Sequence, residues 1–217
     1  IKFEKELLEI LAKRKLVERE PYKEFRAQEE ELEASFEHAD TPDQRKALAE
    51  IFSEMEKPVP LERILTGDVG FGKTEVALRV AYRAILNNKQ VALLAPTTIL
   101  AEQHYELFKK RFEQFGASVA RFSRLGNAGS SDADIAIGTH KLLGKGVEFK
   151  NLGLLIIDEE QKFGVAHKEH FKKVNPALDI LTLSATPIPR TLNQALSGIS
   201  NISSIETPPL GKTTIQT

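Results

Sequence analysis

A glycine-rich stretch with one lysine interrupts an apolar run in the first half of the chain. Residues 67–74 read Gly-Asp-Val-Gly-Phe-Gly-Lys-Thr, which fits the phosphate-loop pattern G-x-x-x-x-G-K-[ST]. Glycines let successive backbone amides turn inward around phosphate oxygens, the lysine reaches the outer phosphates, and the threonine hydroxyl is a ligand for Mg²⁺. The stretch predicts a nucleoside triphosphate site rather than a tight turn alone. The predicted binding residues are Gly67, Asp68, Val69, Gly70, Phe71, Gly72, Lys73 and Thr74.

Two carboxylates directly follow another apolar run, in residues 153–160, which read Gly-Leu-Leu-Ile-Ile-Asp-Glu-Glu. A buried parallel strand presents its functional residues at its carboxyl end. We expect Asp158 to hold Mg²⁺, directly or through water, and Glu159 to polarise the attacking water. The alternative is that both are solvated turn acids. Together with Lys73 and Thr74, they predict the core of an NTPase.

Short apolar runs alternate with helical patterns over most of the chain. Strands are predicted over 63–65, 91–94, 119–122, 135–137, 154–157 and 180–183. Helices are predicted over 44–56, 73–87, 98–115, 165–174 and 189–197. Several strand candidates are continuous Leu, Ile and Val runs, which is typical of buried parallel strands. The alternation predicts an α/β fold with a parallel sheet and helices on both faces.

The segment between two of these strands is short and rich in glycine and serine. Only residues 126–133 separate Leu125 from Asp134, whereas a parallel crossover usually takes a dozen residues or more and contains a helix. We expect a short non-helical connection here, which leaves part of one sheet face less covered and does not affect the nucleotide site.

Residues 1–35 differ from the rest in being rich in Lys and Glu and free of glycine. Pro21 divides them, which predicts one helix before it and a second over about 22–32. We interpret them as a solvated amphipathic helix pair, the alternative being a helix that binds a specific partner. We place a domain boundary before residue 36, so that 36–217 form the main lobe. Because the chain begins at Ile1 and stops without completing an element, we expect it to be a piece of a longer protein.

The composition excludes several classes of protein. The 217 residues carry a net charge of −1 and include no cysteine, so a globally basic nucleic-acid binder, a disulfide framework and a thiolate metal site are excluded. A local basic patch on one face of the protein is still compatible with this net charge. No run of about 18 apolar residues and no signal-like segment is present in the sequence. We therefore expect a cytoplasmic protein without membrane contact.

The order of motifs resembles that of superfamily 2 DNA helicases and translocases. Thr41-Pro-Asp-Gln44 is similar to their adenine-reading Q motif, and Pro96-Thr-Thr98, followed by Leu100, Ala101, Gln103 and His104, to motif Ia. Gly138-Thr-His140 is similar to the next strand-tracking motif, Asp158-Glu-Glu-Gln161 to motif II, and Ser184-Ala-Thr186 to motif III. The resemblance implies a RecA-like lobe that uses ATP and Mg²⁺.

One branch of that superfamily is a closer match, through residues 67–77, 137–143, 158–165 and 184–190. It contains the bacterial transcription-repair coupling factors and the RecG fork-remodelling helicases, and Phe71 with the 41–44 motif favours the coupling factors. Gln161 stands where the branch usually has histidine. The resemblance gives Gln161 a catalytic role alongside Lys73, Asp158 and Glu159, and the missing charge puts the coupling of hydrolysis to DNA movement in doubt.

The resemblance also implies contacts with adenine and DNA. Gln44 would read the adenine edge and Phe36 would stack on the ring, although Phe36 also suits simple core packing. The residues expected to line the groove for one DNA strand are Thr97, Thr98, Thr139, His140 and Arg190. The alternatives are a helix-capping role for Thr97 and a turn role for His140.

These motifs predict the first motor lobe of a double-stranded DNA translocase that binds without sequence preference. The second lobe, which supplies an arginine to the γ-phosphate, is expected to be missing, so the chain alone should hydrolyse ATP poorly. In the longer protein, partners would include RNA polymerase and repair proteins, reached through other domains. The alternatives are a RecG-type fork helicase and a nucleotide-dependent switch without motor activity.

Overall fold

A computed structural model describes residues 14, 16–123, 126–128, 132–143, 147–159, 172, 175–186 and 201–209. Its strands are β1 (Glu62–Gly67), β2 (Gln90–Leu94), β3 (Val119–Ser123), β4 (Gly126–Ala128), β5 (Ile135–Gly138), β6 (Leu152–Asp158), β7 (Asp179–Ser184) and β8 (Asn201–Ile205). Its helices are α2 (Arg26–Ala34), α3 (Pro42–Met55), α4 (Lys73–Leu86) and α5 (Thr98–Phe112), with short 3₁₀ turns η1 (Glu113–Phe115) and η2 (His140–Leu143).

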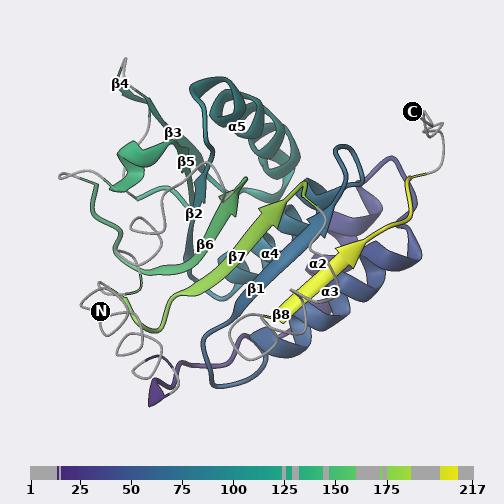
Figure 1. Cartoon of the computed structure of the whole chain (residues 1–217). Helices are drawn as coiled ribbons and strands as arrows, with labels where there is room; N and C mark the ends of the chain where they lie inside the picture. Colours follow the sequence, from purple (N-terminus) through teal and green to yellow (C-terminus); the bar gives the residue numbers. More distant parts are fainter. Residues whose placement is uncertain are drawn as a thin grey trace, which may run out of the picture.

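The eight strands form one sheet in the order β4-β3-β5-β2-β6-β7-β1-β8, with β4 and β8 at its edges (Figure 1). Every pairing is parallel except that of β4 with β3. All six strands predicted from apolar runs are present, and the RecA-like α/β fold is confirmed. The strand β8 was not predicted, because two serines break its apolar run and an edge strand needs only half of its side chains buried.

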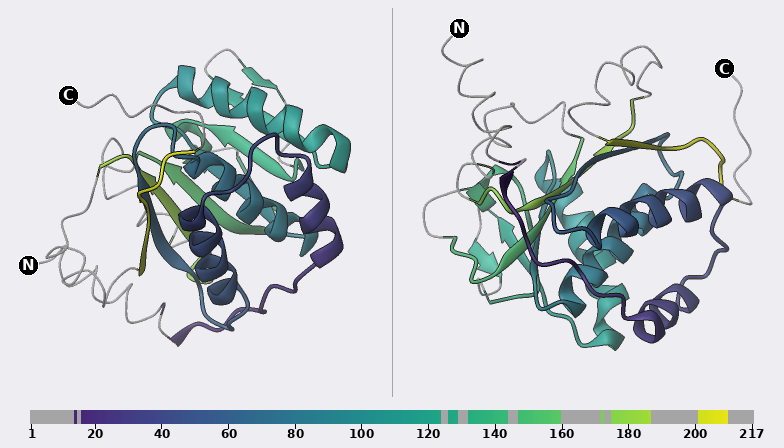
Figure 2. Two further views of the ribbon diagram at one scale, coloured as in Figure 1. Left: turned by 90° about the vertical axis from the view of Figure 1, so that its right-hand side faces the viewer. Right: turned by 90° about the horizontal axis from the view of Figure 1, so that it is seen from below.

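The described helices gather on one side of the sheet, as the right-hand view of Figure 2 shows. Their apolar stripes form one core with alternate strand residues such as Leu65, Leu93 and Ile156. The neighbouring strand residues, such as Leu94 and Ile157, form a second core on the opposite face. Apart from residue 172, the helices predicted over 165–174 and 189–197 lie outside the described residues. Among those residues, no helix has both the length and the apolar character needed to cross a bilayer.

The segment before α2 is tied to the sheet rather than solvated. Arg19 donates through Nε to Asp179 Oδ1 at 2.9 Å, and the backbone amide of Leu61 donates to the same oxygen at 2.6 Å. Tyr22 lies under the Arg19 guanidinium and donates its hydroxyl to the Gly153 carbonyl at 3.2 Å. Burial raises the pKa of Asp179 to about 6, although Arg19 and the Leu61 amide act to lower it.

The second predicted helix begins at Arg26 instead of about residue 22. Residues 21–25 are not helical, and the backbone amide of Lys23 donates to the side chain of Asn87 at 2.8 Å. Tertiary hydrogen bonds thus replace the first helical turn. The helix predicted before Pro21 lies almost entirely outside the described residues.

The connection after β3 is non-helical over residues 126–128, as expected. These residues turn back as the short antiparallel strand β4, with Ser123 opposite Gly126. An added edge strand of this kind was not foreseen from the Gly/Ser-rich sequence.

Candidate nucleotide and DNA site

The glycine-rich loop lies at the carboxyl end of β1 and leads directly into α4. Gly70 and Gly72 have φ values of +81° and +84°, a left-handed conformation that side chains disfavour. Gly72 is the N-cap of α4, which begins at Lys73. The Lys73 ammonium donates back to the carbonyls of Gly67 and Asp68, the latter at 3.0 Å. The loop therefore presents a helix N-terminus and a cation to the same space, which suits a phosphate group.

The Q-motif glutamine is joined to this loop through its side-chain amide. Gln44 is 2% exposed and belongs to a capping box in which its Oε1 accepts from the Thr41 amide at 2.8 Å. Its Nε2 donates to the Phe71 carbonyl at 2.8 Å. A Cβ placed on Gly72 would come within 2.0 Å of that nitrogen, so the glycine makes room for the contact. The adenine-reading role of Gln44 stays a prediction.

The two carboxylates of motif II occupy different environments. Asp158 ends β6, and its Oδ2 lies 2.7 Å from His104 Nε2. Glu159 has a φ of +57°, which is uncommon for a residue other than glycine. Its amide donates to the Leu183 carbonyl of β7 at 2.9 Å, which holds this turn against the sheet. The sequence placed His104 in motif Ia but did not indicate its contact with Asp158.

Phe36 lies against cationic side chains. The centre of its ring is 5.1 Å from Arg111 Cζ and 6.0 Å from Arg79 Cζ, and the ring meets His38 edge-on at 5.5 Å. Its proposed role in adenine stacking stays a prediction.

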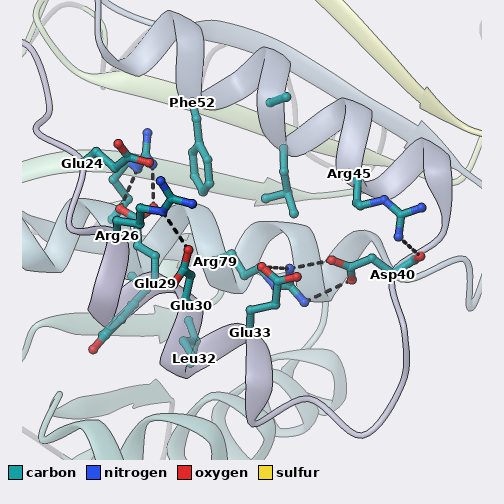
Figure 3. Close-up of a pocket in the computed structure, with 14 residues that line it drawn as sticks. Glu24, Arg26, Glu29, Glu30, Leu32, Glu33, Asp40, Arg45, Phe52 and Arg79 are labelled. Carbon is teal, nitrogen blue, oxygen red and sulfur yellow. Dashed lines mark hydrogen bonds and ion pairs between the residues drawn. The ribbon is translucent and has the colours of Figure 1, made fainter.

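Buried arginines of α4 hold the segments that lead into the Q motif, beside a cavity of about 350 Å³ (Figure 3). Arg79 donates to both carboxylate oxygens of Asp40, at 2.6 and 3.0 Å, and to Glu75 at 3.1 Å. Arg83, which is 2% exposed, forms two hydrogen bonds with Glu29 of α2 at 2.5 and 2.8 Å. The sequence did not predict this network, because all of its pairs except Glu75–Arg79 join residues that are far apart in the chain.

Four of the five predicted DNA-contact residues follow two neighbouring strands at the carboxyl end of the sheet. Thr97 and Thr98 follow β2, Thr139 and His140 follow β5, and β2 pairs with β5. Thr97 caps α5 by accepting from the Leu100 amide at 3.2 Å, as its alternative interpretation predicted. Thr98 and His140 are exposed, whereas Thr139 is buried. Contact with DNA stays a prediction.

Motif III, Ser184-Ala-Thr186, lies at the carboxyl end of β7 and is held by its own hydroxyl groups. The Thr186 amide donates to the Ser184 hydroxyl oxygen at 3.2 Å, and their two hydroxyls are 2.8 Å apart. Gln161 and Arg190 lie outside the described residues.

The two side chains that are expected to hold magnesium carry suitable donor atoms. The Thr74 hydroxyl and the Asp158 carboxylate offer oxygen ligands, which Mg²⁺ prefers. Within the described ranges, no group of three or more His, Cys, Asp or Glu could hold a metal. A Mg²⁺ held by these two side chains would keep several of its waters, as it does in nucleotide sites.

The parallel sheet, the glycine-rich loop and the acidic strand end define a P-loop lobe of the RecA-like class. Within that class, the chain belongs to the DEAD/DEAH box helicase family, whose model matches residues 41–195.

Individual relatives carry names from one branch of helicases. The chain is 48% identical to the transcription-repair-coupling factor of Myxococcus xanthus, with 100% of this chain and 19% of the relative covered. It is 46% identical to that of Staphylococcus epidermidis, over 98% of this chain and 19% of the relative. The chain thus spans about a fifth of the length of these relatives. The predicted resemblance to a coupling-factor motor lobe is confirmed.

Solved structures agree with this assignment. The structure of RecG bound to a three-way DNA junction matches with a TM-score of 0.77 and 32% identity, covering 99% of this chain and 31% of that one. The UvsW helicase of bacteriophage T4 has a TM-score of 0.61 at 18% identity, with 86% and 70% covered, and supports the fold alone.

Proposed function

We propose that this chain is the ATP-binding motor lobe of a double-stranded DNA translocase. The observation that carries the proposal is that the phosphate loop follows β1 and that Asp158 ends β6, both at the carboxyl end of the parallel sheet. β6 and β1 are separated only by β7, so the two strand ends lie about 10 Å apart at roughly 4.8 Å per strand. That spacing would allow the loop residues and Asp158 to act on one bound nucleotide.

In this proposal the residues divide the work by chemistry. Loop amides and the Lys73 ammonium bind the phosphates, and Thr74 and Asp158 hold Mg²⁺, which would neutralise charge on the phosphate oxygens. Glu159 orients and polarises the attacking water. A second lobe of the longer protein would add an arginine, which is typically worth about 10³-fold or more in turnover. This chain by itself should therefore bind ATP and hydrolyse it very slowly.

Calorimetry with Mg-ATP tests nucleotide binding by this chain. Lys73→Ala should abolish the heat of binding, because the ammonium that balances the outer phosphates is lost. Lys57→Ala removes an exposed lysine at the end of α3 and should leave binding unchanged. An unaltered affinity in Lys73→Ala would exclude the loop as the nucleotide site.

DNA tracking and polymerase displacement are proposed for the longer protein. Hydroxyls and backbone amides after β2 and β5 would hold phosphates, giving binding that is independent of sequence and weakened by salt. RNA polymerase and repair proteins would be reached through domains outside this chain. The longer protein should show DNA-stimulated ATP hydrolysis that falls as salt rises. Nucleotide binding without such stimulation would favour the switch without motor activity.

A fork-remodelling helicase is the second candidate, favoured by the 32% identity to the RecG structure. Displacement of a stalled RNA polymerase by the longer protein supports the coupling-factor function. Regression of a branched DNA junction without that displacement supports the RecG-type function.

A further inference from the structure

One side-chain contact joins the helix after β2 to the strand end that carries the motif II carboxylate. His104 Nε2 lies 2.7 Å from Asp158 Oδ2, which is within hydrogen-bonding distance. His104 is 8% exposed, and the Asp158 side chain is 13% exposed. The contact is therefore largely shielded from water, where a hydrogen bond to a carboxylate is stronger than at the surface.

The direction of this hydrogen bond follows from the acceptor. An ionised carboxylate has no proton to donate, so His104 must donate from Nε2. One lone-pair direction of Oδ2 is thereby taken up, and Oδ1 stays available for a metal or a metal-bound water. The His104 Nε2–H donor therefore favours one orientation of the Asp158 carboxylate group.

The imidazole is itself held by packing. Phe108, one helical turn further along α5, is 0% exposed and meets the His104 ring edge-on with the ring centres 6.4 Å apart. The cap at Thr97 fixes where α5 begins, and β2, which precedes it, pairs directly with β6. Packing and hydrogen bonding therefore hold α5, the His104 ring and the Asp158 carboxylate in fixed positions relative to one another.

We propose that His104 is a positioning residue that orients Asp158 for Mg²⁺ through the Nε2–Oδ2 hydrogen bond. The inference rests on the proposed nucleotide function and adds a residue to it. Removing a residue that hydrogen-bonds to a metal ligand typically changes metal affinity about 10- to 100-fold. Removing the His104 donor should therefore raise the Mg²⁺ concentration that nucleotide binding requires, without changing how the loop binds phosphate.

The test compares two replacements of similar length in this chain. His104→Gln retains an N–H donor, whereas His104→Met fills the space without one. Glu106→Gln, an exposed change on the same helix, is the matched control. Binding of a fluorescent ATP analogue is titrated with Mg²⁺ for each variant, and thermal unfolding verifies that each one is folded.

His104→Met should require about 10-fold more Mg²⁺ for half-maximal binding, with metal-free nucleotide binding unchanged. His104→Gln should recover much of that loss, and the control should match the parent sequence. Equal Mg²⁺ requirements in the parent sequence and in folded His104→Met would overturn the inference alone. So would equal losses in the Met and Gln variants, since a donor would then be irrelevant. Absence of nucleotide binding by the parent sequence itself would overturn the proposed function as well.

A spectroscopic readout decides the matter if both variants fail to fold. ¹⁵N NMR of the histidine ring in the parent chain should show a proton on Nε2 of His104. A ring that lacks this proton cannot donate to the carboxylate, and that result would refute the positioning role.

Discussion

Substitution of Gly72 by alanine is expected to disrupt the contact between the Q motif and the phosphate loop. Gly72 has a φ of +84°, and a Cβ there would lie 2.0 Å from Gln44 Nε2. Non-bonded heavy atoms normally stay about 3.5 Å apart, so the glutamine amide must move by about 1.5 Å. That displacement breaks its 2.8 Å hydrogen bond to the Phe71 carbonyl.

Two costs add to give the expected magnitude. The left-handed conformation costs an alanine about 1–2 kcal/mol. A buried amide that loses its partner costs about 1–3 kcal/mol more. Gly72→Ala should therefore lower the free energy of unfolding by about 2–5 kcal/mol, measured by urea denaturation. Nucleotide affinity should fall as well, because the loop carbonyl and the α4 N-terminus shift together.

Gly116 provides a matched control for the backbone term. Its φ is +70°, and a Cβ there meets nothing within 4 Å. Gly116→Ala should cost only the conformational term of about 1–2 kcal/mol. In a Gln44→Ala background, the added cost of Gly72→Ala should shrink toward that of Gly116→Ala, because the clashing amide is gone. If Gly72→Ala is no more destabilising than Gly116→Ala in the parent sequence, the steric argument is wrong.

Three further changes test the scaffold. Asp179→Asn should flatten the pH dependence of stability between about pH 4 and pH 6. Burial raises the folded-state pKa of Asp179 from 3.8 to about 6, so the folded chain keeps a proton that the unfolded chain releases. Stability should therefore fall by about 3 kcal/mol as the pH rises through that window, as checked by urea titrations, and an unchanged slope in the variant would contradict this. Arg83→Met should cost about 2–4 kcal/mol in chemical denaturation because it removes a buried arginine from the largely shielded Glu29 carboxylate, whereas Arg26→Met, in an exposed pair, should cost almost nothing; equal costs would refute the distinction. Thr97→Val should cost about 1 kcal/mol of stability by removing the cap that accepts from the Leu100 amide, and an unchanged melting temperature would count against that role.

The parts of the fold that could be predicted are those with a local cause. Continuous apolar runs such as Leu154–Ile157 must be buried on both sides, which specifies a parallel strand wherever they lie. The capping box of Thr41 and Gln44 and the glycines of the phosphate loop likewise act through neighbours in the chain. These features can be recognised in the sequence because burial on both faces and local backbone geometry require those residue types.

Other elements have no local signal. The strand β8 owes its conformation to pairing with β1, and its own residues, Asn-Ile-Ser-Ser-Ile, predict little. The segment around Arg19 and Tyr22 is not helical, and its hydrogen bonds to Asp179 and Gly153, more than 130 residues away in the chain, hold it against the sheet. Charge-rich composition suggested a solvated helix pair there, because sequence cannot show that an arginine has a buried carboxylate to meet.

The amino-acid sequence is enough to recognise a phosphate loop after one buried strand, carboxylates at the end of another, and the ordered motifs of a helicase lobe. Those features depend on residue types at short spacing. Which polar groups contact one another depends on how the chain folds: His104 with Asp158, Gln44 with the Phe71 carbonyl, and Arg83 with Glu29. Each of these contacts depends on the order of strands and on the angle at which a helix crosses them. A few ångströms separate a hydrogen bond from none, and periodicity along the chain does not carry distances between segments that fold together.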